Sequence, residues 1–193
     1  MNLTLDENHI YRFEGKVVDG LTSTLQEAGL IRSGDEWFMT RGTAVHLATE
    51  YYDKMSLDES TVDPQIQGYL DSWKRFRVEQ NYTPIEIEYP IFHPELLVAS
   101  KVDRLPLLDL KTGSHAPWHV LQIGFQWVTL RIDHPSDISW APKTVYLDPD
   151  GGSPKVKVYS TVELREAFKV YCSILHFIRW RRSVGIKNAN GNL

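Results

Sequence analysis

The stretch "VDRLPLLDLKTG", residues 102–113, decides the fold, because it places two carboxylates and an ammonium in a largely apolar segment. Asp103, Asp109 and Lys111 lie among residues that have the composition of buried β-strands. A charge inside a protein core is costly, so it shifts its pKa, finds a partner or binds a metal ion. We therefore expect two strands joined by a tight connection, with charged groups that serve a function.

The length of this connection sets the face on which the first aspartate lies. Because side chains alternate along a strand, Asp103 faces Asp109 only if the loop has an odd number of residues. A loop over 105–107 or 104–108 satisfies this condition, whereas a two-residue loop at 105–106 turns Asp103 to the opposite face. We expect the odd register, in which opposed Cβ atoms are about 4.5–5.5 Å apart and both carboxylates can bind one divalent cation.

Paired carboxylates in this register are a candidate site for a hard cation. Oxygen ligands of this kind suit Mg²⁺ or Mn²⁺. Without a cation, two carboxylates so close together raise the pKa of one of them strongly. For the motif taken alone, a simpler alternative is that Asp103 beside Arg104 and Asp109 beside Lys111 form local salt bridges at strand ends. The sequence around this motif has to distinguish a metal site from local salt bridges.

The rest of the chain predicts helices packed on a mixed sheet. Hydrophobic periodicity and turn signals predict helices over 21–30, 40–55, 64–80, 117–132 and 161–182. They predict strands over 85–92, 96–103 and 107–111, a hairpin over 143–159, and a short hairpin or extended segment over 9–18. The fold class is therefore α/β (α+β), a central mixed β-sheet flanked by helices, in one domain over 1–193 with a frayed tail at 183–193.

Two of these helices carry polar side chains on a face of their own. The helix over 40–55, with Thr40 as N-cap, has an apolar stripe of Ala44, Leu47, Ala48, Tyr51 and Met55. Another face of that helix carries Thr43, His46, Glu50 and Asp53. In the helix over 117–132, Gln122, Gln126 and Thr129 lie opposite the side of Leu121, Phe125 and Val128.

Composition narrows the class of protein. No apolar run is long enough to span a bilayer and the N-terminus lacks a signal-peptide core, so we expect a cytoplasmic protein with no membrane partner. The single cysteine, Cys172, rules out an internal disulfide and a four-cysteine metal site. A net charge of −4 disfavours a protein that coats nucleic acid, but Lys and Arg cluster locally at 73–77 and 179–182.

Four stretches, in this order, carry a family likeness: "RGTAVH" (41–46), "SKVD" (100–103), "DLKTG" (109–113) and "PWHVLQIGFQ" (117–126). Together they resemble the RecB-type branch of the PD-(D/E)XK nuclease superfamily, and within it the short phage-encoded exonucleases. The likeness covers residues from about 9 to 182.

The resemblance implies a fold and an activity. It implies a restriction-endonuclease-like core and a DNA exonuclease that depends on Mg²⁺ or Mn²⁺ and acts in phage DNA recombination, repair or degradation in the host cytoplasm. DNA is then the substrate, and a phage recombination protein or a single-strand-binding protein is a candidate partner. Two positions depart from the family pattern: Ser100 replaces the usual glycine, and Gln126 replaces the usual tyrosine.

The resemblance also assigns roles to residues. It implies metal ligands in His46, Asp103, Asp109 and the backbone carbonyl of Leu110. Lys111 would stand beside the attacking water and the scissile phosphate, and Gln122 would position Lys111 or a phosphate, which completes a catalytic set of Asp103, Asp109, Lys111 and Gln122. Glu50, one turn after His46, is a candidate to orient the imidazole, and Glu88 is given no catalytic role. The expected nucleic-acid-binding residues are Arg41, Lys74, Arg75 and Gln126.

Two other functions remain open on the same scaffold. The chain could be a catalytically silent protein that binds nucleic acid or a host protein, which the departures at Ser100 and Gln126 motivate. It could also be an endonuclease. No motif encodes strand polarity, strand number or oligomeric state.

Overall fold

The computed structural model describes residues 2–7, 9–31, 36–133 and 141–186. Its strands are β1 (Leu3–Leu5), β2 (Tyr11–Phe13), β3 (Lys16–Gly20), β4 (Glu86–His93), β5 (Val98–Leu105), β6 (Leu108–Lys111), β7 (Lys143–Tyr146) and β8 (Lys155–Val158). Its helices are α1 (Leu21–Glu27), α2 (Glu36–Asp53), α3 (Pro64–Glu79), α4 (His119–Asp133) and α5 (Thr161–Ser183), with a short 3₁₀ turn at Glu59–Thr61.

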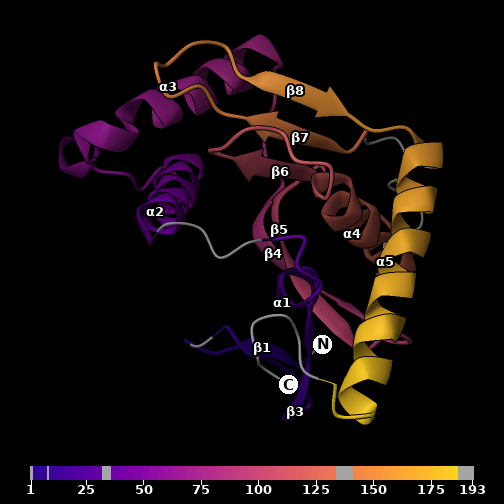
Figure 1. Cartoon of the computed structure of the whole chain (residues 1–193). Coiled ribbons are helices and arrows are strands. Elements are labelled where there is room, and N and C mark those ends of the chain that lie inside the picture. Colours follow the sequence, from indigo (N-terminus) through magenta and orange to yellow (C-terminus); the bar gives the residue numbers. More distant parts are fainter. Residues whose placement is uncertain (1, 8, 32–35, 134–140, 187–193) are drawn as a thin grey trace.

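The described strands form one mixed sheet with helices on both sides (Figure 1). The strand order is β1-β2-β3-β5-β6-β7-β8, and β4 pairs with β5 outside this path. One hydrophobic cluster joins the sheet to α1, α4 and α5, and a second joins it to α2 and α3. The expected fold class, a mixed sheet flanked by helices, is therefore confirmed.

The sheet forks at β5: two different strands, β3 and β6, pair with the two ends of the same edge of β5. β4 pairs with β5 over 98–105, so β3 and β6 must share the other edge. β3 runs parallel to β5 at its start, where Gly20 lies beside Ala99, and β6 joins it at its end, where Arg104 pairs with Leu108. Between these two points, the described strands leave part of the β5 edge without a neighbour.

The pairing of Arg104 with Leu108 also settles the register. Three residues, 105–107, lie between this pair in the chain, which places Asp103 opposite Asp109. The odd register expected from the sequence is confirmed, and both carboxylates lie on one face beside the fork.

The helix that carries His46 packs differently from the sequence expectation. α2 begins at Glu36, so Thr40 lies inside the helix and is not its N-cap. The expected apolar stripe is confirmed only in part: Ala48 is buried and Ala44 packs against the core, but Leu47 and Tyr51 are exposed and Met55 is 94% exposed. Val45 and Thr49 complete the buried face.

A buried ion pair explains this rotation of α2. Asp53, expected on the polar face, accepts from Arg104 Nε at 2.6 Å, and both side chains are fully buried. The other Asp53 oxygen accepts from Arg77 Nη1 at 2.9 Å and from Trp73 Nε1 at 3.0 Å. Because a buried charge must be paired, this network fixes the face of α2 more firmly than its apolar stripe does. It also ties α2 and α3 to β5.

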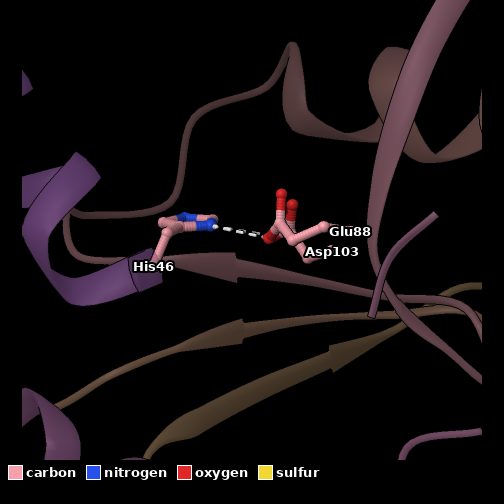
Figure 2. Close-up of side chains that lie close together, drawn as sticks. All are labelled: His46, Glu88 and Asp103. Carbon is pink, nitrogen blue, oxygen red and sulfur yellow. Dashed lines mark ion pairs between the residues drawn. The ribbon is translucent and has the colours of Figure 1, made fainter. Parts of the chain in front are cut away.

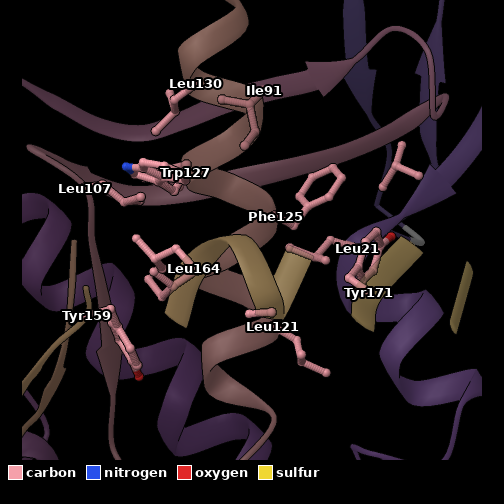
Figure 3. Packing of buried hydrophobic residues seen from close by; sticks show 14 of the residues in the cluster. Leu21, Ile91, Leu107, Leu121, Phe125, Trp127, Leu130, Tyr159, Leu164 and Tyr171 are labelled. Atoms are coloured by element: carbon pink, nitrogen blue, oxygen red, sulfur yellow. The ribbon is translucent and has the colours of Figure 1, made fainter. Parts of the chain in front are cut away.

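α4 is buried on nearly every side, because it lies between the sheet and α5 (Figure 3). The close contact is made at Gly124, where an added Cβ would stand 2.9 Å from Leu164 O and from Ala167 Cβ. Gln126 and Thr129, expected on a polar face, are therefore buried. The Thr129 hydroxyl donates a hydrogen bond to the backbone carbonyl of Phe125.

The remaining elements follow the sequence closely. The hairpins β2–β3 and β7–β8 are present, and the expected buried stripes of α3 and α5 are confirmed except that Phe168 is only partly buried. α1 ends just before Gly29, which has a positive φ of 75°. The end of the expected tail, 187–193, lies outside the described residues. Among the helices described, none combines the length and the hydrophobicity needed to cross a bilayer.

We predict that Asp53→Ala lowers the free energy of unfolding by about 3–5 kcal/mol, because it leaves Arg104 buried without its main counter-charge. Urea unfolding followed by circular dichroism measures this loss. The matched control is Glu166→Ala, which breaks an exposed pair with Lys169 and should cost less than about 1 kcal/mol. Equal losses in the two variants would show that the buried pair does not hold α2 in place.

Candidate metal centre

Three carboxylates line up across neighbouring strands at the fork. Ile87 pairs with Arg104 and Tyr89 with Val102, so Glu88 of β4 stands opposite Asp103 of β5. Asp103 in turn stands opposite Asp109 of β6. Directly opposed residues point to the same face of a sheet, so these three acids form one row.

α2 brings His46 to this row, and Figure 2 shows the imidazole facing Glu88 and Asp103. His46 Nδ1 is 3.6 Å from Asp103 Oδ2 and 4.0 Å from Glu88 Oε1. One ligand atom from each of these three residues lies within 4.8 Å of the others. Imidazole nitrogen with carboxylate oxygens is a ligand set suited to a divalent first-row metal or to Mg²⁺.

The second ring nitrogen of His46 fixes how the imidazole is presented. Nε2 lies 3.2 Å from the backbone carbonyl of Leu110, which can only accept a hydrogen bond. Nε2 therefore carries a hydrogen, and Nδ1 is the nitrogen that faces the carboxylates. The expected orienting residue, Glu50, instead accepts from Lys54 at 2.6 Å. The carbonyl of Leu110, expected as a metal ligand, serves here as the acceptor that orients His46.

The carboxylates set the charge of the imidazole. Burial lowers the pKa of His46, but the negative charge of Asp103 and the contact with Glu88 outweigh it, so the net shift is upward. The pKa of Glu88 is lowered to about 2: burial opposes this shift, and hydrogen bonds to His46 and Lys101 more than offset it. Lys101 Nζ lies 2.6 Å from Glu88 Oε2. Glu88 is thus a carboxylate at neutral pH, as a metal ligand has to be.

Asp103 bridges the two strands where they part. Its Oδ2 accepts a hydrogen bond from the backbone N–H of Leu110 at 2.7 Å, and the residue as a whole is only 8% exposed. A carboxylate oxygen here substitutes for a backbone acceptor, so the fork opens without leaving that N–H unsatisfied. The first acidic strand is therefore held against the second by the candidate ligand itself.

Asp109 is the most buried member of the row, at 1% exposed. Its Oδ1 accepts from Lys111 Nζ and from Gln122 Nε2, both at 2.7 Å. Its Oδ2 is buried and has no hydrogen-bond partner. Burial raises the pKa of Asp109 to about 6; the charge of Lys111 opposes this and that of Asp103 adds to it. An orphaned, buried carboxylate oxygen in this cavity fits a bound cation, but Asp109 is not among the three residues, His46, Glu88 and Asp103, whose ligand atoms lie within 4.8 Å of one another.

Lys111 and Gln122 complete the expected catalytic set. Lys111 Nζ lies 2.7 Å from Asp109 Oδ1 and 3.1 Å from Gln122 Oε1, so both partners hold the ammonium in place. The structure thus brings together His46, Asp103, Asp109, Leu110, Lys111 and Gln122. All six line a cavity of about 590 Å³, which Glu88 also lines.

Glu88 is the candidate ligand that the sequence analysis missed. "IEIEYPIF" reads as a half-buried strand, in which Glu86 and Glu88 have the same parity and both read as solvent-facing. The hairpin register between β4 and β5 is the signal that separates them, because it sets Glu88 alone opposite Asp103. Glu88 also has a positive φ of 53°, which is uncommon for a non-glycine residue in a strand.

The four expected nucleic-acid-binding residues do not form one surface. Arg41 lines a second cavity that adjoins the metal centre. Lys74 pairs with Glu59 at 2.7 Å, and Arg75 donates to the carbonyl of Gly151; both line a small hollow that shares no residue with the acidic cavity.

Gln126 has a structural role in this fold. It is 1% exposed and donates from Nε2 to the carbonyl of Lys101 at 3.1 Å. Lys101 lies opposite Pro90, which has no N–H to donate. The expectation that Gln126 contacts nucleic acid is therefore wrong for this conformation, because its amide is used inside the core.

Comparisons with models of known protein families and with curated proteins find no match to this chain. The geometry of the site therefore has to carry the functional argument.

We predict that Glu88→Gln weakens Mn²⁺ binding at least about 10-fold, because it removes one of three converging ligands. Isothermal titration of the metal-free chain measures the affinity. The matched control is Glu50→Gln, since Glu50 lines the same cavity but is paired with Lys54. If both variants bind Mn²⁺ like the wild type, Glu88 is not a ligand.

The metal-free chain should lose stability relative to Asp109→Asn as the pH rises. Folding raises the pKa of Asp109 from 3.8 to about 6, so the protonated carboxyl is favoured in the folded chain. Its contribution to the free energy of unfolding is full below about pH 3.8 and is lost as the pH rises through 6. Between pH 4.5 and pH 7 the difference in unfolding free energy should change by about 2 kcal/mol. Urea unfolding in EDTA tests this expectation, and parallel pH profiles for the two chains would refute it.

Proposed function

We propose that this protein is a divalent-metal-dependent nuclease that hydrolyses phosphodiester bonds in DNA. The observation that carries the proposal is the convergence of His46, Glu88 and Asp103 in the cavity that also holds the ion pair of buried Asp109 with half-buried Lys111. Acidic ligands suited to Mg²⁺ or Mn²⁺ next to a positioned ammonium provide what phosphodiester hydrolysis requires.

The residues divide the work between binding and positioning. His46, Glu88 and Asp103 would hold the cation, and Asp109 would hold Lys111 in the same cavity. Such a cation lowers the pKa of a water molecule and offsets phosphate charge. Lys111, held by Asp109 and Gln122, stands ready to orient the attacking water or to stabilise the negative charge that builds on the phosphate oxygens.

The resemblance described above favours an exonuclease, in phage DNA recombination, repair or degradation. Under this proposal the substrate is linear DNA, the protein acts in the host cytoplasm, and a phage recombination protein or a single-strand-binding protein is a candidate partner. An endonuclease on the same scaffold would instead cut closed circular DNA.

We predict that the wild-type chain shortens end-labelled linear DNA with Mg²⁺ or Mn²⁺ and not in EDTA. Asp103→Asn and Lys111→Ala should each lower the rate by at least about 100-fold, because each removes a group needed in the transition state. Lys169→Ala is the matched control for a lysine, because Lys169 lies exposed on α5. Gel electrophoresis of labelled products gives the rates.

The same assay distinguishes the alternatives. Cleavage of closed circular DNA would identify an endonuclease. DNA or protein binding without turnover in any divalent metal would identify a catalytically silent protein. Equal rates in the wild type and both site variants would reject the assigned residues.

A further inference from the structure

A second cavity, of about 950 Å³, opens beside the metal centre. Its walls come from the loop after β6, from α2 and α3, and from the β7–β8 hairpin. Thr112 and Gly113 line both this cavity and the acidic one. The two cavities therefore lie on either side of one loop and share part of their walls.

The sheet places three side chains in a row that leads from the first cavity into the second. Lys111 of β6 lies beside Tyr146 of β7, and Tyr146 lies opposite Lys155 of β8. β6 and β7 are parallel, so their carboxyl ends open to the same side, where ligands bind in open sheets of this kind. Neighbouring strands are about 4.8 Å apart, so the backbone of Lys155 lies roughly 10 Å from that of Lys111.

Aromatic rings cover the floor of the second cavity. His115, Trp118 and Tyr146 line it, and His119 packs beneath them with its ring centroid 4.2 Å from that of Trp118 and 5.7 Å from that of Tyr146. Lys111 Nζ, in the acidic cavity, lies 5.8 Å from the Trp118 ring centroid, so this ring is close to the first cavity as well. His115 is exposed, and Trp118 is partly exposed.

The charged groups of the second cavity are mostly cationic. Arg41 lies over the Tyr69 ring and donates to Thr112 O. Lys155 is exposed, and no carboxylate among the described residues lies within ion-pair distance of it. Lys157 pairs with Glu163 at 3.0 Å. The carboxylate in the lining, Asp148, accepts the backbone N–H of Asp150.

We propose, on the basis of the nuclease function above, that this second cavity binds the unpaired DNA strand next to the bond that is cleaved. Its bases would stack on Trp118 and His115, and its phosphates would contact Arg41 and Lys155. Aromatic rings beside cations are the means by which proteins bind single strands without sequence preference. In a duplex the bases are paired and stacked on one another, so they cannot use these rings. The cavity thus selects single-stranded ends.

The test is a binding measurement on the wild-type chain in EDTA, with fluorescence anisotropy of a labelled oligo-dT and of a blunt hairpin duplex. Lys155→Gln and His115→Ala change exposed side chains. Each should weaken oligo-dT binding about 5- to 10-fold and change duplex binding less than about 2-fold. Lys155→Gln should also lower the salt-dependence slope by about 0.7. The control Lys169→Gln should bind like the wild type.

A photocrosslink locates the strand independently of any variant. Oligo-dT with 5-iododeoxyuridine should crosslink to the tryptic peptide 112–131, which contains both His115 and Trp118. Crosslinks confined to other peptides, unchanged oligo-dT binding in both variants, or equal weakening of single-strand and duplex binding would each overturn the inference.

The two proposals fail in different ways. Metal-dependent cleavage by the wild type, with no effect of Lys155→Gln or His115→Ala on oligo-dT binding, would overturn the single-strand site and leave the nuclease function standing. Weakened oligo-dT binding in these variants, together with absence of cleavage, would overturn the nuclease function and leave the single-strand site.

Discussion

The fork on one edge of β5 is the constraint on which the rest of the structure depends. β3 and β6 share this edge at its two ends, so backbone groups between them lose their strand partners. A sheet cannot leave such groups buried and unsatisfied. The chain meets this need with a side chain: Asp103 accepts a hydrogen bond from the N–H of Leu110. The opening that results is where acidic groups of three strands face α2.

The helices pack on the sheet so that α2 and α4 bring side chains to this opening. The buried pair of Asp53 and Arg104 fixes the rotation of α2, and His46 lies two turns before Asp53 on the same helix. α4 packs closely on α5 through Gly124 and presents Gln122 to Asp109 and Lys111 from the other side. His46 and Gln122 are thus placed by contacts that lie outside the site, the Asp53–Arg104 ion pair for His46 and the Gly124 packing for Gln122.

Sequence analysis predicted the parts of this arrangement that depend on local pattern. The odd loop over 105–107 set the register of the two aspartates, and strand alternation put Lys111 beside Asp109. It could not predict the face of α2, because the stripe with Leu47 and Tyr51 competes with a buried ion pair between residues 51 positions apart. It could not single out Glu88 either, since only the pairing of β4 with β5 separates Glu88 from Glu86.

The same limit explains the polar face expected for α4. Gln126 and Thr129 are ordinary surface residues by type, and only the three-layer packing buries them. The residues predicted for the site line one cavity, but roles such as that of the Leu110 carbonyl depend on atomic distances. Local pattern therefore gave the neighbourhood of the site, and tertiary contacts gave its ligands.

The contacts of Arg104 also affect how the site would bind a metal ion. Its guanidinium also reaches Glu88 Oε1 at 3.3 Å, and it donates to Thr49 and to the carbonyl of Asp103. The fully buried guanidinium of Arg104 thus holds the Glu88 carboxylate in position as part of the core. Such a site is preorganised: its side chains are already ordered, so a metal ion that bound there would cost little conformational entropy.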